Sequence, residues 1–134
     1  GGGMIVRLDF PAPELFPNAK AKSGGRHRAM PAKTKAKHDA FMLAKQAMGD
    51  WKAREGLIPI SIVFVPPDRI KRDWDGMAGA AKHALDGIAM AIGVDDSRFR
   101  PVLIDIVDAK KPGAMLVAVG VEIRTGVNLE VAEV

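Results

Sequence analysis

The sequence contains no cysteine and no tyrosine among its 134 residues. Without cysteine there can be no disulfide, no zinc ribbon and no thiol nucleophile, and a reducing compartment is the expected environment. The missing tyrosine removes one common base-stacking side chain. No apolar run reaches the roughly 18–20 residues that a membrane-spanning helix needs. We therefore expect a cytoplasmic protein that does not enter membranes.

Several catalytic motifs are also missing. There is no Walker A loop, and no GxGxxG pattern follows a predicted strand. The three histidines, His27, His38 and His83, lack the spacing of a metal site. Ser61 and Ser97 have no histidine near them in the sequence. These absences leave the carboxylates as the main candidates for catalysis.

The length and composition predict one globular domain over residues 4–134. Apolar residues make up 48% of the chain and alternate with charged ones, as in ordinary globular proteins. We interpret Gly1 to Gly3 as a vector-derived scar before a native Met4, with no apolar stretch typical of a signal peptide.

The net charge of +4 conceals a strong asymmetry. Seven of the 20 cationic residues lie between Leu15 and His38, a stretch without any acid. The other 13 cations accompany all 16 acids, so the rest of the chain is slightly acidic. Localised positive charge favours a polyanionic partner, although a solvated surface loop explains it equally well. The seven cations are Lys20, Lys22, Arg26, Arg28, Lys33, Lys35 and Lys37.

Hydrophobic periodicity predicts two helices and four strands. The predicted strands cover residues 4–10, 58–65, 102–107 and 115–123, and the predicted helices cover residues 32–55 and 75–92. Prolines, paired glycines and cations predict a long loop over residues 11–31. The order β-α-β-α-β-β indicates an α/β (α+β) fold, a single sheet of about four strands with two main helices packed on it.

The second predicted helix carries a stripe of small residues, Ala80, Ala84, Gly87 and Ala91. Small residues let another backbone approach closely, either from a neighbouring helix or from a second subunit. We favour packing within the chain. Of the seven aromatic residues, which include Trp51 and Trp74, most look like core residues.

Four aspartates flank this second helix. Asp73 and Asp75 lie just before it, where two residues of an extended chain point the same way. Helix capping explains one of these two well and the other less well. Asp95 and Asp96 follow the helix, which is about 25 Å long. They can join the first pair only if the chain folds back after Gly93.

Clustered carboxylates are preferred ligands of Mg²⁺ and Mn²⁺. A metal held in this way can activate water and stabilise displacement at phosphorus. Together with the basic segment, the four aspartates favour a metal-dependent nuclease. In this hypothesis Arg69, Lys71 and Arg72, next to the first aspartate pair, contact DNA phosphates as well.

The segment PDRIKRDWDGMAGAAKHALDG, followed by GVDDSRF and a predicted hairpin, resembles the RusA-type Holliday junction resolvases. Their signature is D-[LV]-D-N-L-x-K-A-x-x-D-A-L-N-G and then D-D-[SA]-[QR]. The resemblance covers residues 60–106. It implies a small homodimeric α/β endonuclease, often carried by phages and prophages, that requires Mg²⁺ or Mn²⁺ and nicks four-way junctions symmetrically.

Carried over residue by residue, the resemblance makes Asp73, Asp75 and Asp96 the catalytic metal ligands, with Asp95 beside them. Four departures from the signature affect this assignment, among them His83 in place of the second helical aspartate and about two or three extra residues between Gly87 and Asp95. Gly76 stands where the family has asparagine, and Gly79 stands where it has a catalytic lysine. We hypothesise that Lys82, nearly one turn further along, reaches back toward the phosphate as a substitute. A surface lysine is the simpler reading.

Three functions therefore remain open. The first is a junction-resolving endonuclease, and the second is a DNA-binding member of the same fold that has lost catalysis. The third is an unrelated domain in which Asp73 or Asp75 merely caps a helix. Metal-dependent cleavage separates the first two functions. DNA binding does not, because both functions include it.

Overall fold

The structure is a computed structural model that describes residues 3–16 and 25–121, without the side chains of residues 25–30. Its elements are β1 (Met4–Leu8), η1 (Pro13–Leu15), α1 (Gly25–Met48), β2 (Ile58–Val65), α2 (Trp74–Ile92), η3 (Asp96–Arg98), β3 (Phe99–Ile106) and β4 (Ala114–Val119). Within these described residues, no helix is long and apolar enough to cross a membrane.

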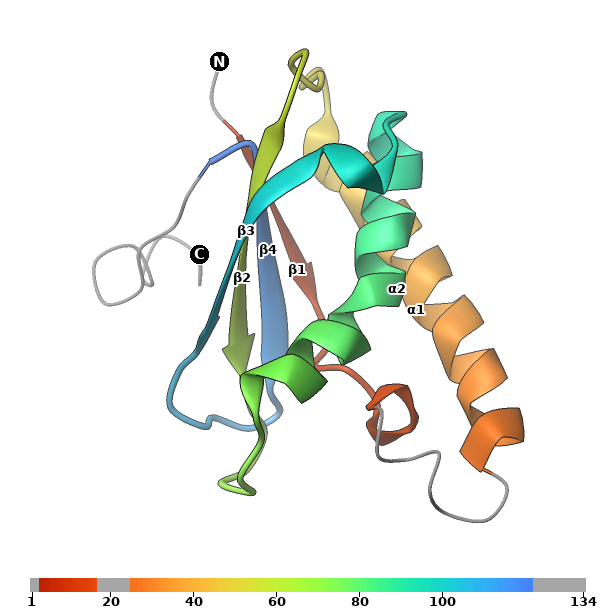
Figure 1. The fold of residues 1–134 in the computed structure, drawn as a ribbon, viewed down its shortest axis with the longest axis vertical. Helices are drawn as coiled ribbons and strands as arrows, with labels where there is room; N and C mark the ends of the chain where they lie inside the picture. The colour runs from red at the N-terminus through yellow and green to blue at the C-terminus, as the bar shows by residue number, and fades with distance from the viewer. Residues whose placement is uncertain (1–2, 17–24, 122–134) are drawn as a thin grey trace.

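The four strands form one mixed sheet in the order β1-β4-β2-β3. β4 is antiparallel to both β1 and β2, while β2 and β3 run parallel. Both helices cover the same face of the sheet (Figure 1). This arrangement confirms the predicted α+β class, the single four-stranded sheet and the order of the main elements.

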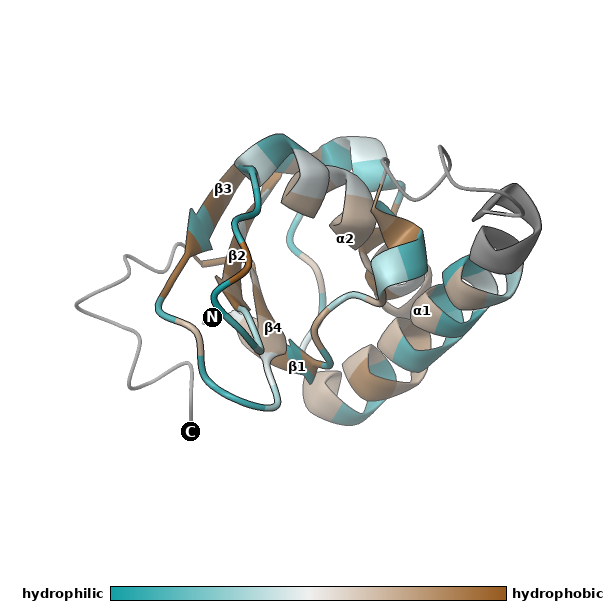
Figure 2. Ribbon diagram, turned by 90° about the horizontal axis from the view of Figure 1, so that it is seen from below, coloured by the Kyte–Doolittle hydropathy of each residue, from teal (hydrophilic) through white to brown (hydrophobic). Residues whose placement is uncertain are grey.

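The alternation of side chains along β4 explains how the sheet divides the core. Met115 and Val117 belong to the large cluster beneath the helices, whereas Leu116 and Ala118 pack with Val63 in a smaller cluster on the other face. All eight residues of the central strand β2 are buried, including Ser61, as its largely apolar sequence predicts. In Figure 2 the strands are largely apolar, and α1 alternates between hydrophilic and apolar residues.

The small-residue stripe of α2 packs against α1, which confirms packing within the chain. A Cβ atom added at Gly87 would lie 2.2 Å from the carbonyl oxygen of Lys37 and 3.1 Å from the amide nitrogen of Phe41. Only glycine permits so close an approach of the two backbones.

The predicted limits of the first helix were wrong. Residues 25–31 are helical rather than part of a loop, although Pro31 lies inside α1, where proline normally disfavours a helix. The C-terminus comes at Met48 instead of residue 55, because Gly49 with φ +48° adopts the left-handed conformation that ends helices. Gly56, which follows the predicted end at residue 55, lies well beyond it. Within the remaining predicted loop, Pro13–Leu15 forms η1 and residues 17–24 lie outside the described part.

Several strand limits also differ. β1 ends at Leu8 rather than at residue 10, where the predicted strand ended. β3 begins at Phe99 rather than 102, because its first residue already pairs with Ile58. β4 ends at Val119, followed by Gly120 with φ +86°. Residues 122 and 123, which were predicted to continue that strand, lie outside the described residues.

One end of the sheet collects the features that matter for function. β2 and β3 end there, β4 begins there, and both α1 and α2 start there (Figure 1). We call this the α2-start end. The positive end of the α2 dipole therefore lies at the strand–helix corner predicted to bind DNA, whereas α1 starts farther away at the same end (Figure 1).

Candidate functional site

The loop between β2 and α2 is held by Asp68 and Arg72. Oδ1 of Asp68 accepts a hydrogen bond from the amide of Ile70 at 3.0 Å and lies 2.9 Å from Nη1 of Arg72. The same guanidinium donates to the carbonyl of Ile70 and stacks 4.9 Å from the ring centroid of Phe10. The Arg72 side chain is consequently only 17% exposed, so it stabilises the loop, whereas Arg69 and Lys71 are exposed.

The turn before β4 packs against this loop. The amide of Lys110 donates to the carbonyl oxygen of Pro66 at 2.8 Å. Arg72 chiefly holds the pKa of Asp68 below its usual value, and Lys111 contributes a smaller electrostatic share. Lys110 and Lys111 therefore join Arg69 and Lys71 at the α2-start end. The sequence indicated only a turn at these two lysines; their position follows from the pairing of β2 with β4.

Asp73 and Asp75 lie at the start of α2, as predicted. Asp73 occupies the N-cap position, but its side chain makes no capping hydrogen bond. Oδ1 of Asp75 accepts from the amide of Gly76 at 2.9 Å. Both carboxylates are exposed. Capping therefore does not account for the Asp73 side chain.

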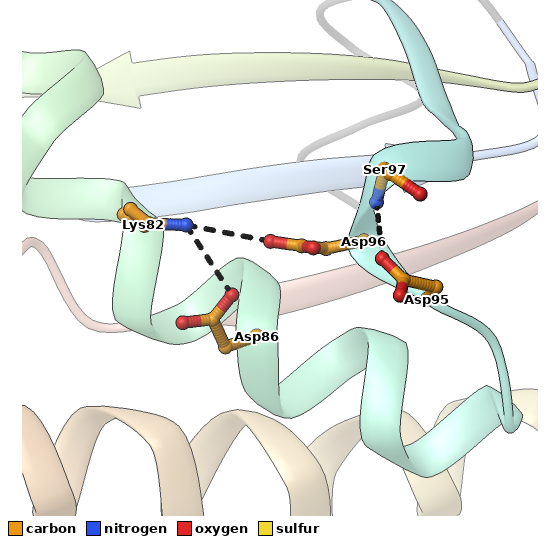
Figure 3. A network of polar contacts seen from close by, with 5 residues as sticks. All are labelled: Lys82, Asp86, Asp95, Asp96 and Ser97. Carbon is orange, nitrogen blue, oxygen red and sulfur yellow. Dashed lines mark hydrogen bonds and ion pairs between the residues drawn. The ribbon is translucent and has the colours of Figure 1, made fainter.

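The chain folds back after α2, as the predicted site required. Gly93, with φ +74°, ends the helix, and its amide donates to the carbonyls of Ala89 and Met90. The following residues then run beside the helix. Oδ2 of Asp96 lies 3.4 Å from Nζ of Lys82, and Oδ1 of Asp86 lies 3.7 Å from the same nitrogen (Figure 3). We call Lys82, Asp86 and Asp96 the lysine–aspartate cluster.

Mutual interactions shift the pKa values within this cluster. Asp86 and then Asp96 raise the pKa of Lys82, so the amine stays charged at neutral pH. Partial burial raises the pKa of Asp86, and hydrogen bonding with Asp96 adds to that rise. The neighbouring Asp95 accepts from the amide of Ser97 at 2.8 Å, which lowers its pKa. Asp95 is thus engaged with its own turn (Figure 3).

The predicted metal ligands do not gather in this conformation. Asp75 and Lys82 are two helical turns apart, about 10 Å along the axis, and Asp96 lies at the level of Lys82. Among the described side chains, those of residues 3–16 and 31–121, no three His, Asp or Glu groups lie close enough together to hold a metal ion. The set Asp73, Asp75, Asp95 and Asp96 therefore does not fit Mg²⁺ or Mn²⁺ as it stands.

The predicted DNA-binding segment is only partly described. Lys20 and Lys22 lie outside the described residues, and Arg26 and Arg28 belong to α1 with side chains that are not described. Lys33 is half-buried, while Lys35 and Lys37 are exposed on α1. Lys35 forms an ion pair with Asp39, one helical turn away.

One aromatic residue of this corner is an exception to the core packing that is expected of most aromatics. Trp74 is 67% exposed, whereas Trp51 packs against the core, as expected of most aromatic residues. Ile70 is 68% exposed in the adjoining loop. The sequence signal that could have indicated this exposure is the position of Trp74 between two aspartates, which are themselves exposed.

Comparison with known proteins adds one relative. No protein-family model matches the sequence. A protein of Xylella fastidiosa described as "Uncharacterized protein" is 35% identical over 98 residues. The aligned part covers 70% of this chain and 61% of that protein, so the chain spans less than two thirds of its relative.

Proposed function

We propose that the chain is a metal-dependent, structure-selective endodeoxyribonuclease of the RusA type, which resolves four-way DNA junctions by phosphodiester hydrolysis. One observation carries the proposal. The chain returns after α2, so that Asp96 lies beside the helix that Asp73 and Asp75 begin. An isolated D-x-D before a helix would need no such return.

DNA would lie across the α2-start end. Arg69, Lys71 and the exposed lysines of α1, Lys35 and Lys37, would contact DNA phosphates. Such contacts supply most of the affinity but no sequence information. Recognition would then depend on the shape of the junction. A two-fold homodimer would place two sites for paired nicks, in the cytoplasm of a bacterial or phage-infected cell.

Mg²⁺ or Mn²⁺ is the cofactor that this proposal implies. When bound, it would polarise the scissile phosphate and activate water. The described conformation does not gather the ligands, so Asp96 would have to leave Lys82 to join Asp73 and Asp75. In the described conformation Lys82 instead pairs with Asp96 and Asp86 and neutralises their charge.

A second candidate is a junction-binding protein of the same fold without cleavage. The engagement of Asp96 by Lys82 favours it, as does Gly79 at the position of the family lysine. Both candidates predict DNA binding that weakens with salt. Only cleavage separates them.

The test is cleavage of a labelled four-way junction in Mg²⁺ or Mn²⁺, beside a linear duplex of matched sequence. We expect symmetric nicks in the junction with the wild type and none with Asp75→Asn. Gly79→Lys restores the family lysine on an exposed position of α2. It should raise the single-turnover rate at least tenfold, a typical effect of a positioned catalytic group. Gly79→Ala is the matched control.

Tight junction binding without cleavage by the wild type in either metal would support the second candidate. Cleavage by Gly79→Lys alone would then identify Gly79 as the cause. Cleavage that Asp75→Asn leaves unchanged would contradict the proposed site.

A further inference from the structure

Trp74 is the first residue of α2, and two thirds of its side chain face solvent. A tryptophan with 67% exposure leaves much of a large apolar surface in water, which favours contact with a partner. Its immediate neighbours in the sequence are the exposed Asp73 and Asp75. An exposed aromatic ring therefore lies within the candidate site itself.

The exposure of Trp74 follows from a well-supported local structure. Asp68 and Arg72 brace the preceding loop by three polar contacts, and Arg72 also stacks on Phe10. On the other side, Met77 is fully buried beneath α2 and anchors the first turn of the helix. The ring is thus presented from a backbone held at both ends.

The charges around this corner indicate what kind of partner the ring meets. Four exposed cations, Arg69, Lys71, Lys110 and Lys111, come from two loops that touch through the Lys110–Pro66 hydrogen bond. Arg72 neutralises Asp68, so these cations remain to attract a polyanion. Trp74 itself lies between Asp73 and Asp75, but the same end of the sheet carries these cations. An exposed aromatic ring beside a basic surface is a combination that binds unpaired nucleobases, because every base has a face that can stack.

We propose that Trp74 is a base-stacking platform that receives an unstacked nucleobase at the branch point of a DNA junction. This inference rests on the proposed function, since it places junction DNA at the α2-start end. A continuous duplex keeps its bases stacked, and exposing one costs a few kcal/mol. Trp74 would therefore favour branched DNA over duplex, independently of cleavage.

The chain provides its own fluorescence control, because it has two tryptophans. Trp51 follows α1, and the Cβ position of Gly120, just past β4, lies 3.4 Å from its ring, so Trp51 lies at the opposite end of the sheet. Trp51→Phe leaves Trp74 as the single emitter, and Trp74→Phe leaves Trp51. Each variant is titrated without divalent metal with an unlabelled four-way junction and with a matched duplex. Anisotropy of the labelled DNAs measures binding separately.

We expect the junction to quench the emission of Trp51→Phe strongly and that of Trp74→Phe little, with weak quenching by duplex. Trp74→Ala should weaken junction binding about tenfold more than duplex binding, within the range found for base–aromatic stacking. Trp74→Phe should retain most of the preference. Circular dichroism checks that each variant is folded.

Unchanged Trp74 emission at saturating junction would overturn the stacking proposal while leaving DNA binding intact. Equal weakening of junction and duplex by Trp74→Ala would also overturn it. If size-exclusion chromatography shows that Trp74→Ala dissociates a dimer, the ring belongs to a protein interface instead. If anisotropy detects no DNA binding by the wild type, the proposed function fails as well.

Discussion

The amine of Lys82 lies 3.4 Å from a carboxylate oxygen of Asp96, which is 14 residues further along the chain. The contact is possible because the chain folds back after α2. It places the lysine amine of the helix beside Asp96, which was predicted to bind metal. The same amine also pairs with Asp86, one helical turn away. The lysine–aspartate cluster thus links the helix to the segment that follows it.

The first prediction concerns the strength of this link. The Lys82 side chain is 64% exposed and that of Asp96 is 41% exposed, so solvent screens the pair. A double-mutant cycle with Lys82→Met and Asp96→Asn should give a coupling free energy of about 0.2–1 kcal/mol in urea unfolding at low salt. Salt at about 1 M should remove most of it.

Lys52→Met, an exposed lysine beyond α1, serves as the control and should show no coupling to Asp96→Asn. A Lys82–Asp96 coupling that is zero at low salt would mean that the fold-back does not hold the two groups together in solution.

The second prediction compares one substitution at two positions of α2. Gly87→Ala would place a Cβ atom 2.2 Å from the carbonyl oxygen of Lys37, so the two helices must separate. We expect a loss of about 2 kcal/mol or more in the free energy of unfolding, as for other overpacked sites. Gly79→Ala, at an exposed position of the same helix, should instead gain about 0.5–1 kcal/mol from helix propensity.

Chemical denaturation of both variants measures the difference. Equal effects at the two positions would contradict the close packing of α1 and α2 at Gly87.

β2 and α1 illustrate how far the sequence predicts the fold. The short apolar run of residues 58–65 predicted the bounds of β2, because local patterning determines a buried central strand. The limits of α1 could not be predicted in the same way. Pro31 argued for a loop, and the helical pattern was extended past Gly49 to residue 55. Tertiary packing against α2 overrides such local signals.

The candidate site divides in the same manner. Asp73 and Asp75 were predictable because their place depends on a strand–helix junction that the sequence marks clearly. The partners of Asp96 depend on the direction of the chain after Gly93, and the approach of Lys110 to Pro66 depends on which strands pair. Neither the direction of the chain after Gly93 nor the pairing of the strands can be predicted from the spacing of residues in the sequence. The prediction that most aromatic residues lie in the core did not single out Trp74, because its exposure depends on the tertiary structure around it.

The third prediction concerns acid stability. Pairing with Arg72 lowers the pKa of Asp68 in the folded state below the value of about 3.9 for an unperturbed aspartate. A depressed carboxyl pKa stabilises the fold above the unfolded-state pKa, and the contribution is lost as the pH falls through the folded-state pKa. The wild type should therefore lose more stability than Asp68→Asn as the pH falls below about 4.

The measurement is urea unfolding of both proteins over a pH series that extends from about 6 to well below the unperturbed aspartate pKa of about 3.9. The asparagine side chain introduced by Asp68→Asn can still accept from the amide of Ile70, so the substitution removes the charge and keeps the turn. Asp108→Asn, at an exposed aspartate of the next loop, is the control. Parallel pH profiles for the wild type and Asp68→Asn would show that the Arg72 pair does not stabilise the loop.

The last prediction tests whether the β3–β4 turn takes part in DNA binding. Lys110 and Lys111 are exposed and lie against the loop that carries Arg69 and Lys71. If each lysine neutralises one phosphate, the slope of log K against log salt should shrink by about 0.9 for each lysine removed. The double variant Lys110→Ala/Lys111→Ala should therefore bind junction and duplex more weakly, with a slope reduced by about 2.

Removing two exposed cations at the other end of the sheet, with Lys52→Ala/Arg100→Ala, should leave the slope unchanged, because those residues lie away from the α2-start end. An equal reduction in both double variants would mean that DNA responds to net charge alone and that this corner is not a DNA-binding surface.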